Sequence, residues 1–200
     1  MNNQPHWHVL ERFIEINTPW LTLIGEKLQD ERQQVLDYWR VEKADSVVIV
    51  TIQNAQFLLP TPSYRPGVKQ ATLDFPGGRV PSSSTPTAAV PEILYRELGI
   101  LNSDIIDLTP LNQTGWAINS SFSNQKLYGF VAEISPHTVI NGDRLTGTYP
   151  TTSEGVTQLL KALTCLQCRA LLWEWFGHRL SKNRGVYLTT RKNPPPEPNF

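Results

Sequence analysis

One stretch of the chain constrains its fold more than any other, namely residues 73–100, LDFPGGRVPSSSTPTAAVPEILYRELGI. Its first residues, Leu73 to Phe75, have the apolar pattern of a strand end. Pro76, Gly77 and Gly78 then stop the strand and force a tight turn, because glycine enters positive φ without a clash at Cβ. The stretch therefore begins as a predicted strand and turn.

A helix is predicted to follow this turn. Thr85 supplies a hydroxyl N-cap, and Pro86 stands at the first helical position, where a missing N–H is no loss. Apolar residues recur at helical spacing at Ala89, Ile93, Leu94 and Leu98. Gly99 closes the helix as a C-cap. Pro91 lies in the interior, where proline is expected to kink the helix.

The same stretch resembles the Nudix box, whose pattern is G-x5-E-x7-R-E-U-x-E-E-x-G-U, with U a bulky apolar residue. With Gly78 as the first glycine, the last falls on Gly99, and Leu94 and Ile100 take the apolar positions without a gap. The flanking LDFPGGR resembles the ELPAGR phrase of the ADP-ribose pyrophosphatase branch, and residues 63–66, SYRP, resemble its QYRP. The resemblance implies an α+β Nudix fold, a mixed β-sheet sandwiched between helices, with an N-terminal β-hairpin.

The charged positions of the box depart from the family pattern. The first glutamate is Ser84, the Arg-Glu pair reads Glu92-Ile93, and the Glu-Glu pair reads Arg96-Glu97. Nudix enzymes split a diphosphate bridge with Mg²⁺ ions held by carboxylates on one helix face. Of those carboxylates only Glu97 is kept, and Arg96 reverses a charge beside it.

The resemblance implies roles for the remaining residues. The Glu97 carboxylate and the Gly77 carbonyl are the candidate Mg²⁺ ligands, and Glu97 and Glu92 are the candidate catalytic residues. Mg²⁺ binding is expected to be weak, because most of the family's ligands are missing. The kink at Pro91 is the one feature that would bring Glu92 toward the position that Ile93 has vacated.

Three arginines and two tryptophans are candidates for substrate binding. Arg65, Arg79 and Arg96 are candidates for the phosphates, because a guanidinium binds phosphate through a two-pronged fork. Trp20 and Trp39 stand where some family members stack adenine on tryptophan. The alternatives stay open: surface arginines paired with acidic neighbours, and tryptophans buried in a core or an interface.

The chain divides into three predicted segments. Residues 1–45 carry two apolar segments, Trp20 to Ile24 and Val35 to Val41, that form a hairpin and, by resemblance, pack across a homodimer. Residues 46–180 form the Nudix domain, and residues 181–200 form an extension that we expect to be disordered.

Within the domain, strands are predicted from Ser46 to Ile52 and from Lys126 to Ile134, the second because it alternates apolar and polar residues. Residues 136–152 are rich in Gly, Asn, Thr and Pro and predict an irregular loop. Ser153 and Glu154 predict a helix start, so Glu154 is interpreted as structural rather than as a catalytic base. The last helix is predicted over residues 166–180.

The two cysteines, Cys165 and Cys168, form a CLQC motif. A redox pair or half of a zinc site is one interpretation. The motif lies in a helical pattern, no second CxxC is present, and His178 is the only histidine that follows it. We therefore favour two small side chains buried on a helix.

Charge and hydropathy exclude two classes of partner. The 18 basic residues balance the 18 acidic ones without a basic stripe, so we expect no nucleic acid partner. No apolar run reaches the length of a membrane span, and the N-terminal residues lack the apolar core of a signal peptide. We expect a cytoplasmic protein that does not bind membranes.

Three functions agree with these observations. The first is hydrolysis of a nucleoside diphosphate derivative, such as ADP-ribose or a nucleotide sugar. The second is a catalytically inactive module that binds such a molecule, with Arg96 standing where metal charge would be. The third, less favoured, is a protein-interaction scaffold.

Overall fold

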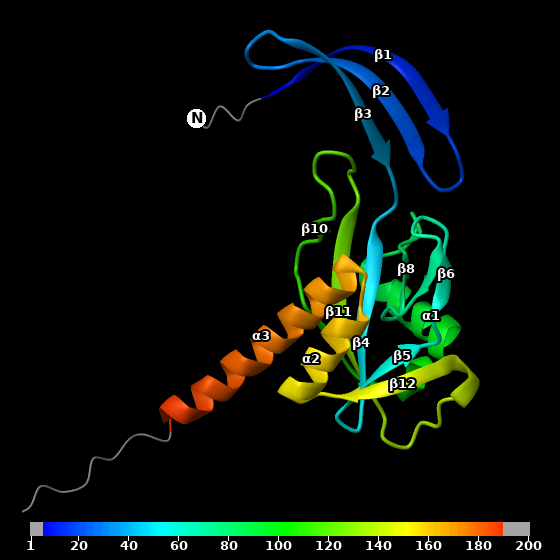
Figure 1. Ribbon diagram of the computed structural model, residues 1–200, viewed down its shortest axis with the longest axis vertical. Helices are drawn as coiled ribbons and strands as arrows, with labels where there is room; N and C mark the ends of the chain where they lie inside the picture. Colours follow the sequence, from blue (N-terminus) through cyan, green and yellow to red (C-terminus); the bar gives the residue numbers. More distant parts are fainter. Residues whose placement is uncertain (1–5, 190–200) are drawn as a thin grey trace, which may run out of the picture.

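The chain folds into a mixed β-sheet between helices, with a separate antiparallel sheet formed by its first strands (Figure 1). This computed structural model describes residues 6–189, with side chains described as far as Ser181. The strands are β1 (His8–Asn17), β2 (Thr22–Gln29), β3 (Val35–Glu42), β4 (Ser46–Gln53), β5 (Gln56–Pro60), β6 (Ser63–Arg65), β7 (Gln70–Thr72), β8 (Gly77–Arg79), β9 (Ile105–Pro110), β10 (Trp116–Ala117), β11 (Lys126–Ile134) and β12 (Leu145–Pro150). The helices are α1 (Pro86–Leu98), α2 (Ser153–Ala162) and α3 (Leu166–Thr189), with 3₁₀ turns η1 (Asn102–Asp104) and η2 (Gly142–Arg144).

Two parallel strands, β4 and β11, form the centre of the larger sheet. Their register places Leu127 opposite Ser46 and Glu133 opposite Ile52. The strand order is β10-β11-β4-β5-β12, and β8 and β9 pair with β4 and β11. A central strand covered on both faces is expected to be a near-continuous apolar run, which is what the sequence VVIV of β4 provides. Both predicted strands are confirmed.

Helices cover both faces of this sheet. Val48, Val50 and Ile52 of β4 belong to the core that contains residues of α2 and α3, whereas Val47 and Ile49 belong to the core that contains residues of α1. The division follows from the alternation of side chains along a strand. In Figure 1, α2 and α3 lie in front of the sheet and α1 lies to one side of it. The predicted α+β class with a sheet between helices is confirmed.

The N-terminal strands form a three-stranded antiparallel sheet with the order β1-β2-β3. The predicted hairpin corresponds to β2 and β3, and β1 was not predicted. All residues of β1 are exposed, among them the apolar Val9, Leu10, Phe13, Ile14 and Ile16. The three strands end at Glu42 and the larger sheet begins at Ser46, so a short linker joins the two sheets.

One buried carboxylate contacts side chains from the other two strands of the N-terminal sheet. Glu26 of β2 is 2% exposed and accepts hydrogen bonds from Arg40 of β3 at 2.9 Å and from Arg12 of β1 at 2.9 Å. The hydrogen bond from Arg40, and secondarily that from Arg12, lowers the pKa of Glu26 although burial opposes this. Glu26 thereby links all three strands.

Three local predictions need correction. Residues 73–75 are not a strand end, because β7 ends at Thr72. The predicted loop over residues 136–152 contains β12, which pairs with β5 and brings Tyr149 opposite Phe57. Residues 76–78 do not form the predicted tight turn, because Gly77 and Gly78 lie in strand β8.

The two ends of α1 follow the capping signals in the sequence. The hydroxyl of Thr85 accepts a hydrogen bond from the Ala88 amide at 3.2 Å, and Gly99 adopts the left-handed conformation with φ 73°. Helix α3 continues beyond the predicted end at residue 180 to Thr189. Residues 190–200 of the predicted extension lie outside the described residues. Within residues 6–189, no helix has the length and apolarity needed to cross a bilayer.

Candidate functional site

The candidate site is built where β8 crosses the C-terminal half of α1. Gly77 and Gly78 of β8 pair with Val48 and Val47 of β4, which fixes β8 on the sheet. A Cβ added to Gly78 would lie 3.1 Å from both the Ile93 side chain and the Arg96 guanidinium. Glycine at this position therefore lets α1 approach β8 closely enough for Arg96 to reach the backbone.

Arg96 lies between the two predicted metal ligands. Its Nη2 donates to the Gly77 carbonyl at 2.9 Å and to Glu97 Oε1 at 2.8 Å, and its Nε donates to the same oxygen at 3.0 Å. The Arg96 side chain is 52% exposed, so the guanidinium faces solvent while it holds both acceptors. Gly77 and Glu97 are thus brought together, with an arginine already bound to them.

This arrangement fits a Mg²⁺ ion poorly. Mg²⁺ requires near-octahedral oxygen ligands. Of the predicted ligands, one carboxylate and one carbonyl are present, and both accept hydrogen bonds from a cation. A second cation at this point would also be repelled by the guanidinium charge. As arranged, the Gly77 carbonyl and the Glu97 carboxylate suit a guanidinium rather than Mg²⁺.

Glu92 does not join this group. It is exposed, and Glu97 lies five positions further along the helix, which corresponds to a rotation of about 140° around α1. Ile93, at the box position normally held by glutamate, is 2% exposed and packs in the core. Since α1 is not broken at Pro91, the helix carries Glu92 away from Glu97.

A cavity of about 590 Å³ brings together three of the predicted substrate-binding residues. We call it the Trp20 pocket, and its lining is Trp20, Leu21, Lys43, Ala44, Gly78, Arg79, Pro81, Arg96 and Gln125. Lys43, Arg79 and Arg96 are cationic, and none of these lining residues is acidic. The pocket therefore presents positive charge beside an aromatic ring.

Arg79 and Trp20 fix the edge of this pocket. The Arg79 guanidinium lies 4.5 Å from the centre of the Trp20 ring, within the range of a cation–π interaction. It also donates to the Pro19 carbonyl at 3.0 Å. Trp20 is 68% exposed, so most of its ring surface remains open.

A second cavity, of about 290 Å³, contains the other predicted arginine. We call it the Arg65 pocket, and its lining is Pro60, Thr61, Ser63, Arg65, Thr72, Asp74, Phe75, Gly77 and Glu97. Arg65 forms an ion pair with Asp74 at 2.8 Å. This is the alternative interpretation of Arg65, a surface arginine paired with an acidic neighbour, and it leaves the guanidinium less free for phosphate.

Trp39 lies apart from both pockets. It is in β3 and packs edge to face against Phe13 of β1, with ring centroids 5.5 Å apart. The ring is 45% exposed. Within the described residues, one chain therefore does not bring Trp39 and Trp20 to the same site.

Two residues of the Trp20 pocket were not predicted. Lys43 lies in the linker between β3 and β4, and Gln125 precedes β11. The Gln125 amide donates to the Ala44 carbonyl at 2.9 Å and to the Ser46 hydroxyl at 2.7 Å, which fixes the linker. Neither residue belongs to a recognisable sequence motif. Each joins the pocket only because the fold brings the linker and β8 together.

A third cavity, of about 320 Å³, lies between β9, β11 and α3 and contains none of the predicted site residues. Glu133 and Asp107 are directly opposite in register there. Burial, followed by the charge of Asp107, raises the pKa of Glu133.

Comparison with solved structures supports the predicted fold, whereas comparison of sequences identifies no family for this chain. No protein-family model matches the chain, and no curated protein matches it. One similar solved structure is described as the crystal structure of an ADP compounds hydrolase, with a TM-score of 0.69 and 19% sequence identity, covering 92% of this chain and 97% of that chain. The likeness confirms the predicted fold, an α+β arrangement with a mixed sheet between helices.

Proposed function

We propose that this protein binds a nucleoside diphosphate derivative, such as ADP-ribose or a nucleotide sugar, in the Trp20 pocket without a metal ion. The observation that carries the proposal is the position of Arg96, which holds the Gly77 carbonyl and the Glu97 carboxylate. The guanidinium supplies fixed positive charge at the point where the family places Mg²⁺.

The diphosphate would lie against the cations of the pocket. Arg79 and Arg96 each offer planar donors that match phosphate oxygens, and Lys43 adds a third positive charge. Charge-assisted hydrogen bonds of this kind are roughly twice as strong as neutral ones. The lining residues themselves include no acidic group, and the Glu97 carboxylate, which lies outside the lining, is bound to Arg96.

The base would stack on Trp20. An exposed indole offers a large flat surface that loses little conformational freedom on binding, and base stacking on aromatic residues contributes about 1–3 kcal/mol. Trp20 lies next to Arg79 and lines the same pocket as Arg96, so stacking and phosphate binding can occur together.

The second candidate is hydrolysis, which the similarity to an ADP compounds hydrolase favours. Hydrolysis by the family's route requires Mg²⁺ held by a carboxylate cluster. The geometry of Arg96 and the position of Glu92 both argue against that cluster, and for this reason binding without turnover is preferred.

Calorimetric titration with ADP-ribose tests this proposal. We expect the same affinity with Mg²⁺ and with EDTA, and no AMP in either sample. Formation of AMP only with Mg²⁺ would establish the hydrolase instead. Absence of heat in both conditions, repeated with UDP-glucose, would overturn binding of this ligand class.

A further inference from the structure

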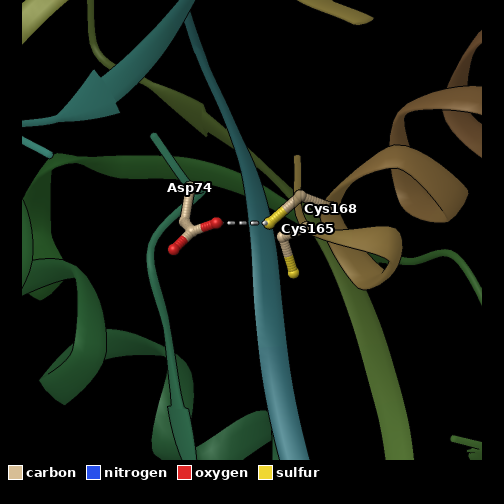
Figure 2. A group of neighbouring side chains, drawn as sticks. All are labelled: Asp74, Cys165 and Cys168. Atoms are coloured by element: carbon tan, nitrogen blue, oxygen red, sulfur yellow. Dashed lines mark hydrogen bonds between the residues drawn. The ribbon is translucent and has the colours of Figure 1, made fainter. Parts of the chain in front are cut away.

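A cluster of three possible metal ligands lies at the start of α3. Asp74, from the segment before β8, meets Cys165 and Cys168 (Figure 2). One carboxylate oxygen and the two sulfurs all lie within 4.8 Å of one another. The CLQC motif therefore has a third potential ligand that is distant in sequence and close in space.

The two cysteines are placed by the first turn of α3. The Cys165 carbonyl accepts from the Arg169 amide at 3.0 Å, so Cys165 caps the helix. Cys168 follows three residues later, a spacing that puts side chains on the same side of a helix. Cys168 is 2% exposed, whereas Cys165 is half-buried, so one sulfur is fixed in the core and the other lies nearer solvent.

Neighbouring groups orient the cluster. The Phe75 amide donates to Cys168 Sγ at 3.4 Å, and the Cys168 thiol lies 3.9 Å from Asp74 Oδ1, the contact drawn in Figure 2. The other carboxylate oxygen, Asp74 Oδ2, accepts from Arg65 at 2.8 and 3.0 Å and from Thr72 at 2.8 Å. Oδ2 is therefore occupied, and Oδ1 is directed at the Cys168 sulfur.

We propose that Asp74, Cys165 and Cys168 form a binding site for a thiophilic divalent cation of the Zn²⁺ class. Thiolates and carboxylates are both zinc ligands, whereas Mg²⁺ and Ca²⁺ select oxygen alone. Bonds of about 2.3 Å to sulfur and 2.0–2.2 Å to oxygen place tetrahedral ligands roughly 3.5–3.8 Å apart. The ligand atoms lie within 4.8 Å of one another and move closer together to reach that geometry.

Charge and coordination number complete the site. Two thiolates, one carboxylate and Zn²⁺ sum to a single negative charge, which the ion pair of Arg65 with Asp74 offsets. Hydrogen bonds from such outer groups typically fix metal ligands and strengthen binding. The described residues supply three ligands, so the fourth is a water molecule or an external ligand on the side of half-buried Cys165.

Titration of the reduced full-length protein with Co²⁺ under anaerobic conditions tests the proposal. We expect a thiolate-to-cobalt charge-transfer band that saturates at one ion per chain and is abolished by one equivalent of Zn²⁺. Cys165→Ser and Asp74→Asn should each weaken Co²⁺ binding by at least about tenfold, since each removes a ligand. Asp143→Asn, which removes an exposed carboxylate elsewhere, should leave binding unchanged.

Cys168 is buried, so its replacement can disturb folding, and Cys165→Ser is the decisive variant. A charge-transfer band of unchanged affinity in Cys165→Ser would contradict the site, as would the absence of a band in the wild type. Loss of both free thiols on exposure to glutathione disulfide, with no Co²⁺ binding by the reduced protein, would establish a dithiol–disulfide pair instead. None of these measurements uses a nucleotide, so they succeed or fail independently of the proposed function.

Discussion

Arg96 determines the chemistry of the candidate site because it satisfies two acceptors at once. The Gly77 carbonyl and the Glu97 carboxylate converge only because Gly78 has no side chain to hold α1 away from β8. The consequence is a fixed cation at the junction of the Trp20 and Arg65 pockets, with Gly78 and Arg96 lining one pocket and Gly77 and Glu97 the other.

Replacement of Arg96 by alanine should weaken ADP-ribose binding. A hydrogen bond to a charged group contributes about 1.5–3 kcal/mol, so the expected loss in Arg96→Ala is roughly 10- to 100-fold. Calorimetry measures the loss directly. Arg32→Ala, which removes an exposed arginine from the β2–β3 turn, is the matched control and should bind normally. Equal affinities of the two variants would contradict the role of Arg96.

Placing a glutamate at Ile93, as the Nudix box pattern has there, should destabilise the fold. Ile93 is 2% exposed and packs in the core under Gly78, so a carboxylate placed there loses its contact with water. We expect Ile93→Glu to lower the free energy of unfolding by about 3 kcal/mol or more. Urea denaturation measures the change. Tyr95→Glu, at a 57% exposed position of the same helix, should have little effect, and similar losses in both would count against the packing argument.

At the scale of elements, the N-terminal sheet depends on the Glu26 carboxylate. Because its folded pKa is lowered, Glu26 stabilises the sheet above the unfolded glutamate pKa of about 4.3, and this contribution is lost as the pH falls through the lower folded pKa. Glu26→Gln should therefore reduce stability by about 1–3 kcal/mol at neutral pH and weaken the acid dependence.

Thermal unfolding followed by tryptophan fluorescence between about pH 3 and 7 measures this effect. Glu11→Gln is a suitable control, since Glu11 is exposed and pairs only with exposed Lys27. Identical pH profiles for Glu26→Gln and the wild type would show that the ion pairs do not stabilise the sheet.

Some elements were predictable from sequence because their signals are local. The apolar run of β4, the alternation of β11 and the caps of α1 each lie within the element itself. β12 was missed because its Gly, Thr and Pro residues favour a loop, and it becomes a strand only by pairing with β5. β1 was missed because all its residues stay exposed within one chain, so it belongs to no buried core.

In the candidate site too, residues with local sequence signals could be predicted, and residues brought together by distant segments could not. Arg79 and Arg96 could be predicted because they lie in or beside the glycine and helix motif. Lys43, Gln125 and the approach of Asp74 to the cysteines could not, because each depends on contacts between segments far apart in the chain. The predicted burial of the cysteines applies to Cys168, whereas Cys165 is only half-buried.

At the scale of the whole molecule, the exposed apolar residues of β1 support a homodimer. Exposed apolar groups concentrated on one element commonly mark an interface, and an edge strand offers unpaired backbone groups as well. We expect Leu10→Glu to convert a dimer to a monomer in sedimentation equilibrium. Val139→Glu, at a 94% exposed apolar position elsewhere, should leave the dimer intact. A monomeric wild type would refute the dimer.

We propose that Arg96 takes the place of a metal ion in contact with the diphosphate. The most direct test is a crystal structure of the protein with ADP-ribose, determined once with EDTA and once with Mg²⁺. We predict phosphate oxygens within hydrogen-bonding distance of Arg96 and Arg79 in both crystals, with the base on Trp20. A Mg²⁺ ion bound between Glu97 and the Gly77 carbonyl, with Arg96 displaced, would contradict the claim.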